Sequence, residues 1–225
     1  MARASRKLRV DDVPADADSD NRYEIVRAAA RAFMVNGYAG TSIDMVADEL
    51  GCTKGRIYYQ YQGKADLFFD VQREAMRMNI AVIEPYVNAQ GSAYERLRSM
   101  IEKQILLNMA EQPFQRVLVQ GVEMHLEGST TPAQREVLNM LIQRRDEYEQ
   151  HFVTVVSQGV KSGEFRAVDP RLFVKVMLGS IIWLTVWYRP RPDETQPKRE
   201  RLASEMTDYM LQGLKPEVAA EVRTR

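Results

Sequence analysis

Basic and aromatic side chains are concentrated in one short stretch of the chain. Lys54, Arg56 and Lys64 lie there with Tyr58 and Tyr59, and no acidic residue separates them. Lysine and arginine neutralise phosphates, and the planar fork of an arginine also matches the O6 and N7 atoms of guanine. The stretch therefore predicts contact with a nucleic acid, with Arg56 as the best candidate for a contact to a base.

Catalytic chemistry is not indicated. An enzyme would need a nucleophile with a base, paired carboxylates or a cluster of metal ligands. With two histidines and one cysteine, Cys52, the chain has little material for a zinc site and cannot form an internal disulfide. Ser129, Thr130 and Thr131 are better explained as a helix cap, and His125 lacks the second histidine of a helical zinc site. We expect no catalytic residue, no metal and no cofactor.

Short helices are predicted to carry the basic stretch. A first helix is expected from Asp20 or Asn21 to Gly37, because glycine readily adopts the left-handed conformation of a helix C-cap. Thr41 is predicted to open a second helix, with Asp44 as its capping-box partner. The apolar residues of this helix recur at the spacing that places them on one face.

Gly51 is predicted to close the second helix, and Thr53 to cap a short third helix that ends near Tyr59. Two short helices joined by a glycine turn are typical of a helix-turn-helix, whose second helix enters the major groove of DNA. A helical hairpin with a basic, solvated face would give the same pattern. The spacing alone leaves that alternative open.

The rest of the chain is predicted to be helical as well, because no segment alternates polar and apolar residues over a sustained length. Capping residues, glycines and prolines divide it into helices. These are expected over about 64–85, from about 92, and over about 113–128, 131–163, 170–188 and 198–213. The sequence thus predicts an all-α fold of about nine helices, with a small N-terminal bundle and a larger C-terminal helical domain.

The predicted organisation has four parts. Residues 1–20 carry a basic block and then an acidic block, which is typical of a disordered arm. Such an arm could enter a DNA minor groove or remain a solvated tail. We place the helix-turn-helix domain over 21–66, the larger helical domain over 67–213 and a C-terminal tail over 214–225.

Composition points to a soluble cytoplasmic protein. The 225 residues include 31 basic and 31 acidic side chains, so the net charge of zero argues against a protein coated with basic charge. The longest uncharged apolar run, 176–188, is shorter than the about twenty residues that span a bilayer. No apolar segment follows the basic start, so we expect neither a signal peptide nor contact with a membrane.

The apolar run 176–188 is also a candidate for association. It is apolar almost all round, so a helix there is expected to be buried on both sides. Trp183, Trp187 and Tyr188 add the aromatic area typical of an interface or a pocket wall. A homodimer would bury such a helix, and so would the core of a single chain; the composition leaves both open.

The stretch Tyr23–Phe68 resembles the DNA-binding domain of the TetR family of bacterial transcriptional regulators. The likeness rests on the string from Thr41 to Ala47, TSIDMVA, on Gly51, and on IYYQYQGK, which ends at Lys64. The chain departs from the family pattern in two places, where it has glutamine for a frequent histidine and tyrosine for the usual phenylalanine. These two residues are Gln60 and Tyr61.

The resemblance implies that nine residues contact double-stranded operator DNA. Those implied to hold the phosphate backbone are Thr41, Ser42, Thr53, Tyr58, Tyr59 and Lys64. Those implied to face base edges are Lys54, Gly55 and Arg56. Lys54 could equally serve a phosphate, and Tyr58 sometimes reaches bases in the family.

The resemblance also implies that the larger domain dimerises and binds a small-molecule effector. Short strings near Gly159 and Trp187 are similar to a subgroup that controls lipid or steroid breakdown and responds to acyl-coenzyme A esters. The pocket residues expected from their size and apolar character are Met109, Phe114, Met124, Phe152 and Trp183. The sequence thus predicts a homodimeric repressor that a largely apolar effector releases from a palindromic operator. A DNA-bound scaffold controlled by a protein partner remains the alternative.

Overall fold

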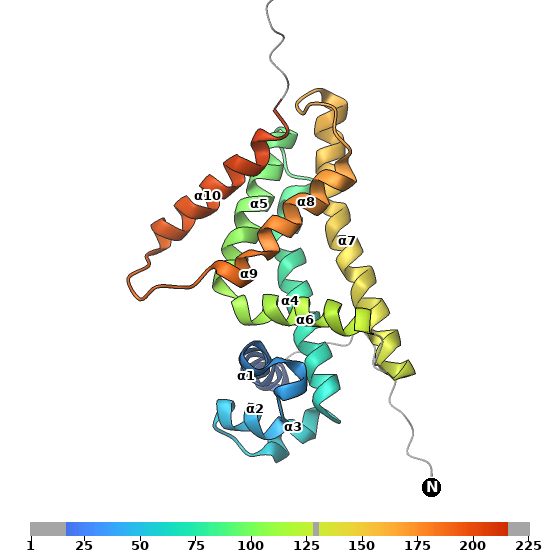
Figure 1. The fold of residues 1–225 in the computed structure, drawn as a ribbon, viewed down its shortest axis with the longest axis vertical. Coiled ribbons are helices and arrows are strands. Elements are labelled where there is room, and N and C mark those ends of the chain that lie inside the picture. Colours follow the sequence, from blue (N-terminus) through green and yellow to red (C-terminus); the bar gives the residue numbers. More distant parts are fainter. Residues whose placement is uncertain (1–16, 128–130, 216–225) are drawn as a thin grey trace, which may run out of the picture.

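The computed structural model describes residues 17–127 and 131–215, and every element in these two ranges is a helix (Figure 1). This confirms the predicted all-α fold. Most of the predicted arm, the tail beyond residue 215, and Ser129 with Thr130 lie outside the described residues. The helices are α1 (Ala17–Gly40), α2 (Ile43–Leu50), α3 (Lys54–Gln60), α4 (Lys64–Val87), α5 (Ala93–Ala110), α6 (Gln112–Glu127), α7 (Pro132–Ser162), α8 (Pro170–Ile182), α9 (Leu184–Trp187) and α10 (Gln196–Gln212). The ninth is a single turn that follows α8 almost directly.

Two of the longer helices begin at the caps predicted from the sequence. Ser92 accepts a hydrogen bond from the N–H of Glu95, whose carboxylate accepts one from the Ser92 N–H, so the capping box before α5 is confirmed. Thr131 and Gln134 form the same reciprocal pair before α7. These caps satisfy N–H groups that have no partner within their own helix.

The start of α2 differs from the prediction. Ser42, not Thr41, is its N-cap, and the Ser42 hydroxyl accepts a hydrogen bond from the N–H of Met45. The Thr41 side chain is buried, and its hydroxyl donates to the carbonyl of Gly37 at 2.7 Å. The predicted capping box with Asp44 is therefore wrong, because the Thr41 hydroxyl closes the end of α1 instead.

Two apolar cores lie along the length of the molecule. The first holds α1, α2 and α3 against the beginning of α4 and against residues of α6 and α7, and in it the rings of Phe33 and Phe68 meet edge to face with centroids 5.0 Å apart. The second gathers the rest of α4 with α5, α7, α8 and α10 around Phe152. Each fully buried side chain of this size stabilises the fold by roughly 1.5–3 kcal/mol. Because α4 contributes to both cores, it joins the α1–α3 bundle to the rest of the chain (Figure 1).

The sequence predicted that the apolar run near the C-terminus is buried on both sides, either by a second copy or by the core of one chain. Within the single chain it is not buried on both sides. The helix breaks at Trp183, and only 28% of the stretch Pro170–Trp187 is buried. Leu172, Val176 and Trp183 are 61%, 63% and 60% exposed. Their spacing places Leu172 and Val176, with Trp183 directly after the helix, on one face of α8, opposite the buried side chains of Val174 and Ile181. One face of this helix is therefore unpartnered in the single chain.

Candidate DNA-binding face and effector cavity

The helix predicted to read the major groove, called here the reading helix, is α3, which lies at one end of the molecule (Figure 1). Tyr58 and Tyr59 are 53% and 83% exposed, whereas Ile57 is fully buried and anchors the helix. Gly55 faces open space, since a Cβ built there would meet only one atom, the hydroxyl of Thr53 at 3.7 Å. Close approach of a nucleic-acid backbone to this face is thus sterically possible. Six of the nine predicted DNA-contact residues are exposed: Ser42, Thr53, Lys54, Gly55, Tyr58 and Tyr59.

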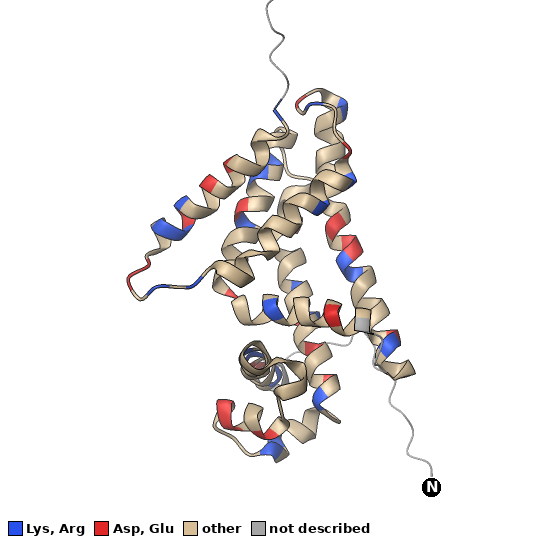
Figure 2. Cartoon of the chain, viewed as in Figure 1, with Lys and Arg blue, Asp and Glu red and all other residues tan. Residues whose placement is uncertain are grey.

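The two basic side chains of α3 are paired with acids of the same chain. The Arg56 guanidinium donates to the Asn21 side-chain oxygen at 2.6 Å and to the Glu24 carboxylate at 2.5 Å. The Lys54 ammonium lies 3.3 Å from the Asp44 carboxylate, and basic and acidic residues accordingly lie close together at this end of the molecule (Figure 2). Exposed ion pairs of this kind contribute about 0–1 kcal/mol, so a phosphate or a base can replace the acid.

Lys64 joins the start of α4 to the end of α1. Its ammonium donates to the backbone carbonyls of Tyr38 and Ala39 at 2.8 and 3.2 Å, and it lies 4.6 Å from the centroid of the Tyr38 ring. An ammonium has three donors, so one is left for a phosphate. Lys64 therefore has a structural role that the sequence analysis did not foresee, in addition to its predicted contact.

Thr41 is the predicted phosphate contact that the structure does not support. Its side chain is 2% exposed and its hydroxyl donates to α1 carbonyls. The hydroxyl is therefore committed to holding the turn between α1 and α2. Its neighbour Ser42 is exposed at the N-cap of α2, where a phosphate can approach.

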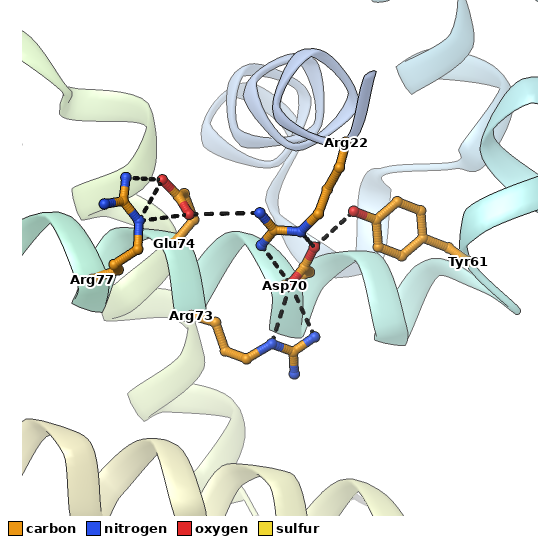
Figure 3. Close-up of polar contacts among 6 residues, drawn as sticks. All are labelled: Arg22, Tyr61, Asp70, Arg73, Glu74 and Arg77. Carbon is orange, nitrogen blue, oxygen red and sulfur yellow. Dashed lines mark hydrogen bonds and ion pairs between the residues drawn. The ribbon is translucent and has the colours of Figure 1, made fainter. Parts of the chain in front are cut away.

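An ion-pair network lies behind this face and joins α1 to α4 (Figure 3). The Arg22 guanidinium makes two hydrogen bonds to the Asp70 carboxylate, at 2.8 and 2.9 Å. The Tyr61 hydroxyl donates to the same carboxylate at 2.7 Å, and Arg73 donates to it at 3.1 Å. Glu74, one turn further along α4, lies 3.8 Å from Arg22. This network was not predicted from the sequence, although the hydroxyl of Tyr61 was visible as a departure from phenylalanine.

The charges in this network set the protonation of its members. Burial alone would raise the pKa of Asp70, but hydrogen bonding and charge from Arg22, together with Arg73, hold that pKa below its ordinary value. Burial and the adjacent Asp70 charge raise the pKa of Tyr61, so its hydroxyl stays a donor. Asp70 is therefore an ionised carboxylate with every close partner a donor, placed where the helix-turn-helix bundle meets α4.

A cavity of about 230 Å³ lies among α4, α5, α6, α7 and α8. Apolar side chains form much of its wall, among them Met76, Leu138, Leu141, Ile142, Leu178 and Ile182. Carboxamide side chains from α4, α5 and α6 form a polar region within it, and Arg145 and Glu149 are its charged lining residues. Tyr148 also lines the cavity, and burial raises the pKa of its hydroxyl. The volume is below the roughly 300–1,000 Å³ of a typical drug-sized pocket, so it fits a small ligand.

None of the five predicted pocket residues lines this cavity. Met109, Phe114 and Phe152 are at most 2% exposed and belong to the two cores. Met124 is half-buried beside the first core, and Trp183 lies on the exposed face of α8. Large apolar side chains fill a core as readily as they line a pocket, so size and hydrophobicity could not separate the two.

Two family models match the chain, and they cover different parts of it. Residues 25–71 match the model described as bacterial regulatory proteins, tetR family. Residues 90–214 match the model described as tetracyclin repressor-like, C-terminal domain. The first range contains the α2–α3 face, and the second contains α5 to α10 with most of the cavity wall.

Individual relatives show the same likeness over most of the chain. The fatty acid metabolism regulator protein of Bacillus subtilis (strain 168) is 23% identical over 159 residues, which is 70% of this chain and 78% of the relative. The solved structure of PfmR, a TetR family transcriptional regulator from Thermus thermophilus, is 26% identical, with a TM-score of 0.72 over 91% of this chain and 100% of that one. AibR, solved with isovaleryl coenzyme A and operator DNA, is 25% identical, with a TM-score of 0.67 over 84% and 97%.

Proposed function

Because this chain belongs to the TetR family and is a DNA-binding transcriptional regulator, we propose that it is a homodimeric repressor released from a palindromic operator by a small, largely apolar effector. The observation that carries this proposal is that α4 serves both sites. Its first turn carries Lys64, which holds the end of α1, while Gln72, Met76 and Asn79 further along line the cavity. A ligand that moves α4 would therefore move the reading helix with it.

Release would be a shift in population between two conformations of the dimer. The effector favours the one whose two reading helices no longer match the spacing of successive major grooves, about 34 Å. A hundredfold loss of operator affinity requires about 2.7 kcal/mol of differential binding. Reciprocity follows, so the operator must weaken effector binding by the same factor.

An acyl thioester of coenzyme A is our leading candidate for the effector. The cavity, at about 230 Å³, is smaller than a typical drug-sized pocket, so only the acyl end of such a thioester would enter it. AibR, which was solved with isovaleryl coenzyme A, supports a short acyl chain. The cytoplasm, where operator DNA and acyl thioesters meet, is the proposed location.

The unpartnered face of α8 supports dimerisation. Its exposed residues Leu172, Val176 and Trp183 form an apolar stripe, and α10 adds Tyr209, which is 79% exposed. Apolar stripes of this kind on a soluble protein mark an association surface. A second copy of the chain, related by a twofold axis, would cover the stripe and place two α3 helices on one side of the dimer.

We expect operator DNA selected from a random pool by the full-length protein to be a near-palindrome, and isovaleryl coenzyme A to lower affinity for it. Calorimetric titration of this thioester into the protein, with and without operator, measures the coupling. Weaker binding in the presence of operator supports allosteric release. Equal affinities in the two titrations would rule it out and favour the scaffold controlled by a protein partner.

Two substitutions on the DNA-binding face should have different consequences. Arg56→Ala is expected to relax the preference at one base pair in each half-site, at a cost of about 1–3 kcal/mol per contact. Lys64→Ala is expected to weaken binding to all sequences about equally and to reduce the salt dependence by roughly two units of slope per dimer. Fluorescence anisotropy on a set of operator variants at several salt concentrations measures both. A change in base preference from Lys64→Ala but not from Arg56→Ala would reverse the two assignments.

A further inference from the structure

Four buried carboxamides on three helices form a connected cluster in the cavity wall. Asn79 of α4 and Gln115 of α6 exchange hydrogen bonds at 2.9 and 3.2 Å. Gln104 of α5 donates to the side-chain oxygens of Asn79 at 3.1 Å and Asn108 at 2.8 Å. Asn108 donates in turn to the backbone carbonyl of Ile181 on α8 at 3.3 Å. The cluster fixes the positions of its four carboxamide groups, because each of them makes at least one hydrogen bond to another member.

Two polar atoms at this wall have no hydrogen-bond partner in the described structure. These are Oε1 of Gln104 and Nε2 of Gln72. The two side chains are 2% and 3% exposed, and both line the cavity. The Gln72 carboxamide lies against Gly121 of α6, where a Cβ would come within 2.2 Å of it. Buried polar groups are almost always hydrogen-bonded to protein, water or a ligand, so these two atoms offer one donor and one acceptor to a molecule bound in the cavity.

The charged residues of the lining are at its edge and already have partners. Arg145 is 47% exposed and lies 3.4 Å from Asp146. Glu149 lies 3.0 Å from Lys175, an exposed side chain on α8. No lysine or arginine lies among the buried lining residues of the described cavity. A carboxylate placed beside the carboxamides would therefore be buried without a counter-charge, which is far more costly than burying a neutral polar group.

We infer that the cavity takes a neutral ligand with an apolar body and a carbonyl or carboxamide head, and that it rejects the corresponding carboxylic acid. This inference rests on the proposed function, because it assigns the chemical class of the effector. The ligand carbonyl accepts a hydrogen bond from Nε2 of Gln72, and a carboxamide head can also donate to Oε1 of Gln104. The apolar body lies against Leu138, Leu141 and Ile182.

Four probes that share a six-carbon chain test the head group by calorimetry with the full-length protein. Hexanamide and the hexanoyl thioester of N-acetylcysteamine carry a neutral carbonyl, hexanoate is ionised at about pH 7, and 1-chlorohexane lacks a strong hydrogen-bonding group. At least one neutral carbonyl probe should bind about tenfold or more tightly than both hexanoate and 1-chlorohexane. Comparison of the amide with the thioester tells which source of the carbonyl the cavity prefers.

The substitution Gln72→Met keeps the length of the side chain and removes its hydrogen-bonding groups. It should reduce the preference for the neutral carbonyl probes over 1-chlorohexane to near unity, whereas hexanoate should remain excluded, because its charge would still be buried without a counter-charge. Gln158→Met is the matched control, because Gln158 is exposed on α7, outside the cavity, and should leave the preference unchanged. Melting temperatures of both variants show whether either one fails to fold, and the comparison of probes on the unsubstituted protein does not depend on them.

Three results would overturn the inference: equal binding of hexanoate, equal binding of 1-chlorohexane, or binding of neither carbonyl probe. Operator affinity is measured separately by anisotropy with isovaleryl coenzyme A. If the probes show the predicted preference but operator affinity never changes, the ligand class stands and the proposed release fails. If the thioester releases the operator but hexanoate binds as well as hexanamide, release stands and the ligand class fails.

Discussion

Asp70→Ala is expected to lower the free energy of unfolding by about 3 kcal/mol. Breaking a buried ion pair by removing one partner typically costs 3–5 kcal/mol, because the other charge stays buried. The low end applies here, since the Arg22 side chain is 28% exposed and keeps Glu74 within 3.8 Å. The variant also leaves the Tyr61 hydroxyl without its acceptor. Urea unfolding followed by circular dichroism measures the loss.

The pH dependence of this loss identifies its cause. Because the pKa of Asp70 is depressed in the folded state, its contribution is complete above the unfolded-state pKa, about 3.9, and disappears as the pH falls through the folded-state value. The difference between the parent protein and Asp70→Ala should thus be constant near neutral pH and shrink in acid. Glu147→Ala is the control, because this exposed carboxylate pairs with Arg144 at 3.2 Å and is expected to cost less than about 0.5 kcal/mol. Equal losses for the two variants would contradict a buried charge at Asp70.

The helices themselves were predictable because their signals are local. Ser92 with Glu95, Thr131 with Gln134, and Gly51 each act within a few residues of themselves. The start of α2 was misassigned because two adjacent hydroxyls compete for one cap. Which hydroxyl turns inward depends on carbonyl groups of α1 that accept its hydrogen bond. A capping motif covers only the first residues of its own helix, so it does not reveal these acceptors.

The cavity was not predictable in the same way. Its polar wall joins Gln72 and Asn79 to side chains that are distant in sequence, such as Gln104 and Gln115. A signal was present, since Gln72, Met76 and Asn79 recur at helical spacing and a polar residue on a buried helix face requires a partner. Which helix supplies that partner follows from the packing of α4, α5 and α6, which the pattern of one helix does not determine.

The unpartnered face of α8 was recognised only in part. The sequence indicated an apolar helix, but it could not show which side the rest of the chain would cover. The structure divides the helix into a face turned to the core, with Met177 and Ile181, and an exposed face with Leu172, Val176 and Trp183. Because of this division, a substitution on the exposed face can affect association without disturbing the core.

Val176→Glu is expected to prevent dimerisation and to reduce operator affinity by about 10²–10⁴-fold, which is the advantage of linking two binding modules. In a twofold dimer the substitution places a carboxylate in the apolar stripe of both copies, where it would lose its hydration without a partner. The side chain of Val176 is 63% exposed in the single chain, so the fold itself should be retained. Light scattering after size-exclusion chromatography gives the mass, and anisotropy on the selected operator gives the affinity.

The control and the folding test decide whether the stripe is the interface. Leu126→Glu adds the same charge at a side chain on α6 that is 76% exposed and outside the stripe, so it should leave both the dimer and operator binding intact. If Val176→Glu stays dimeric, the two copies meet elsewhere and the exposed face of α8 needs another partner. If it becomes monomeric, melts as the parent chain does and still protects both half-sites at the parent concentration, then dimerisation is not what joins the two reading helices. Loss of the dimer together with loss of affinity, and only for the substitution in the stripe, establishes that twofold pairing through α8 sets the spacing of the reading helices on DNA.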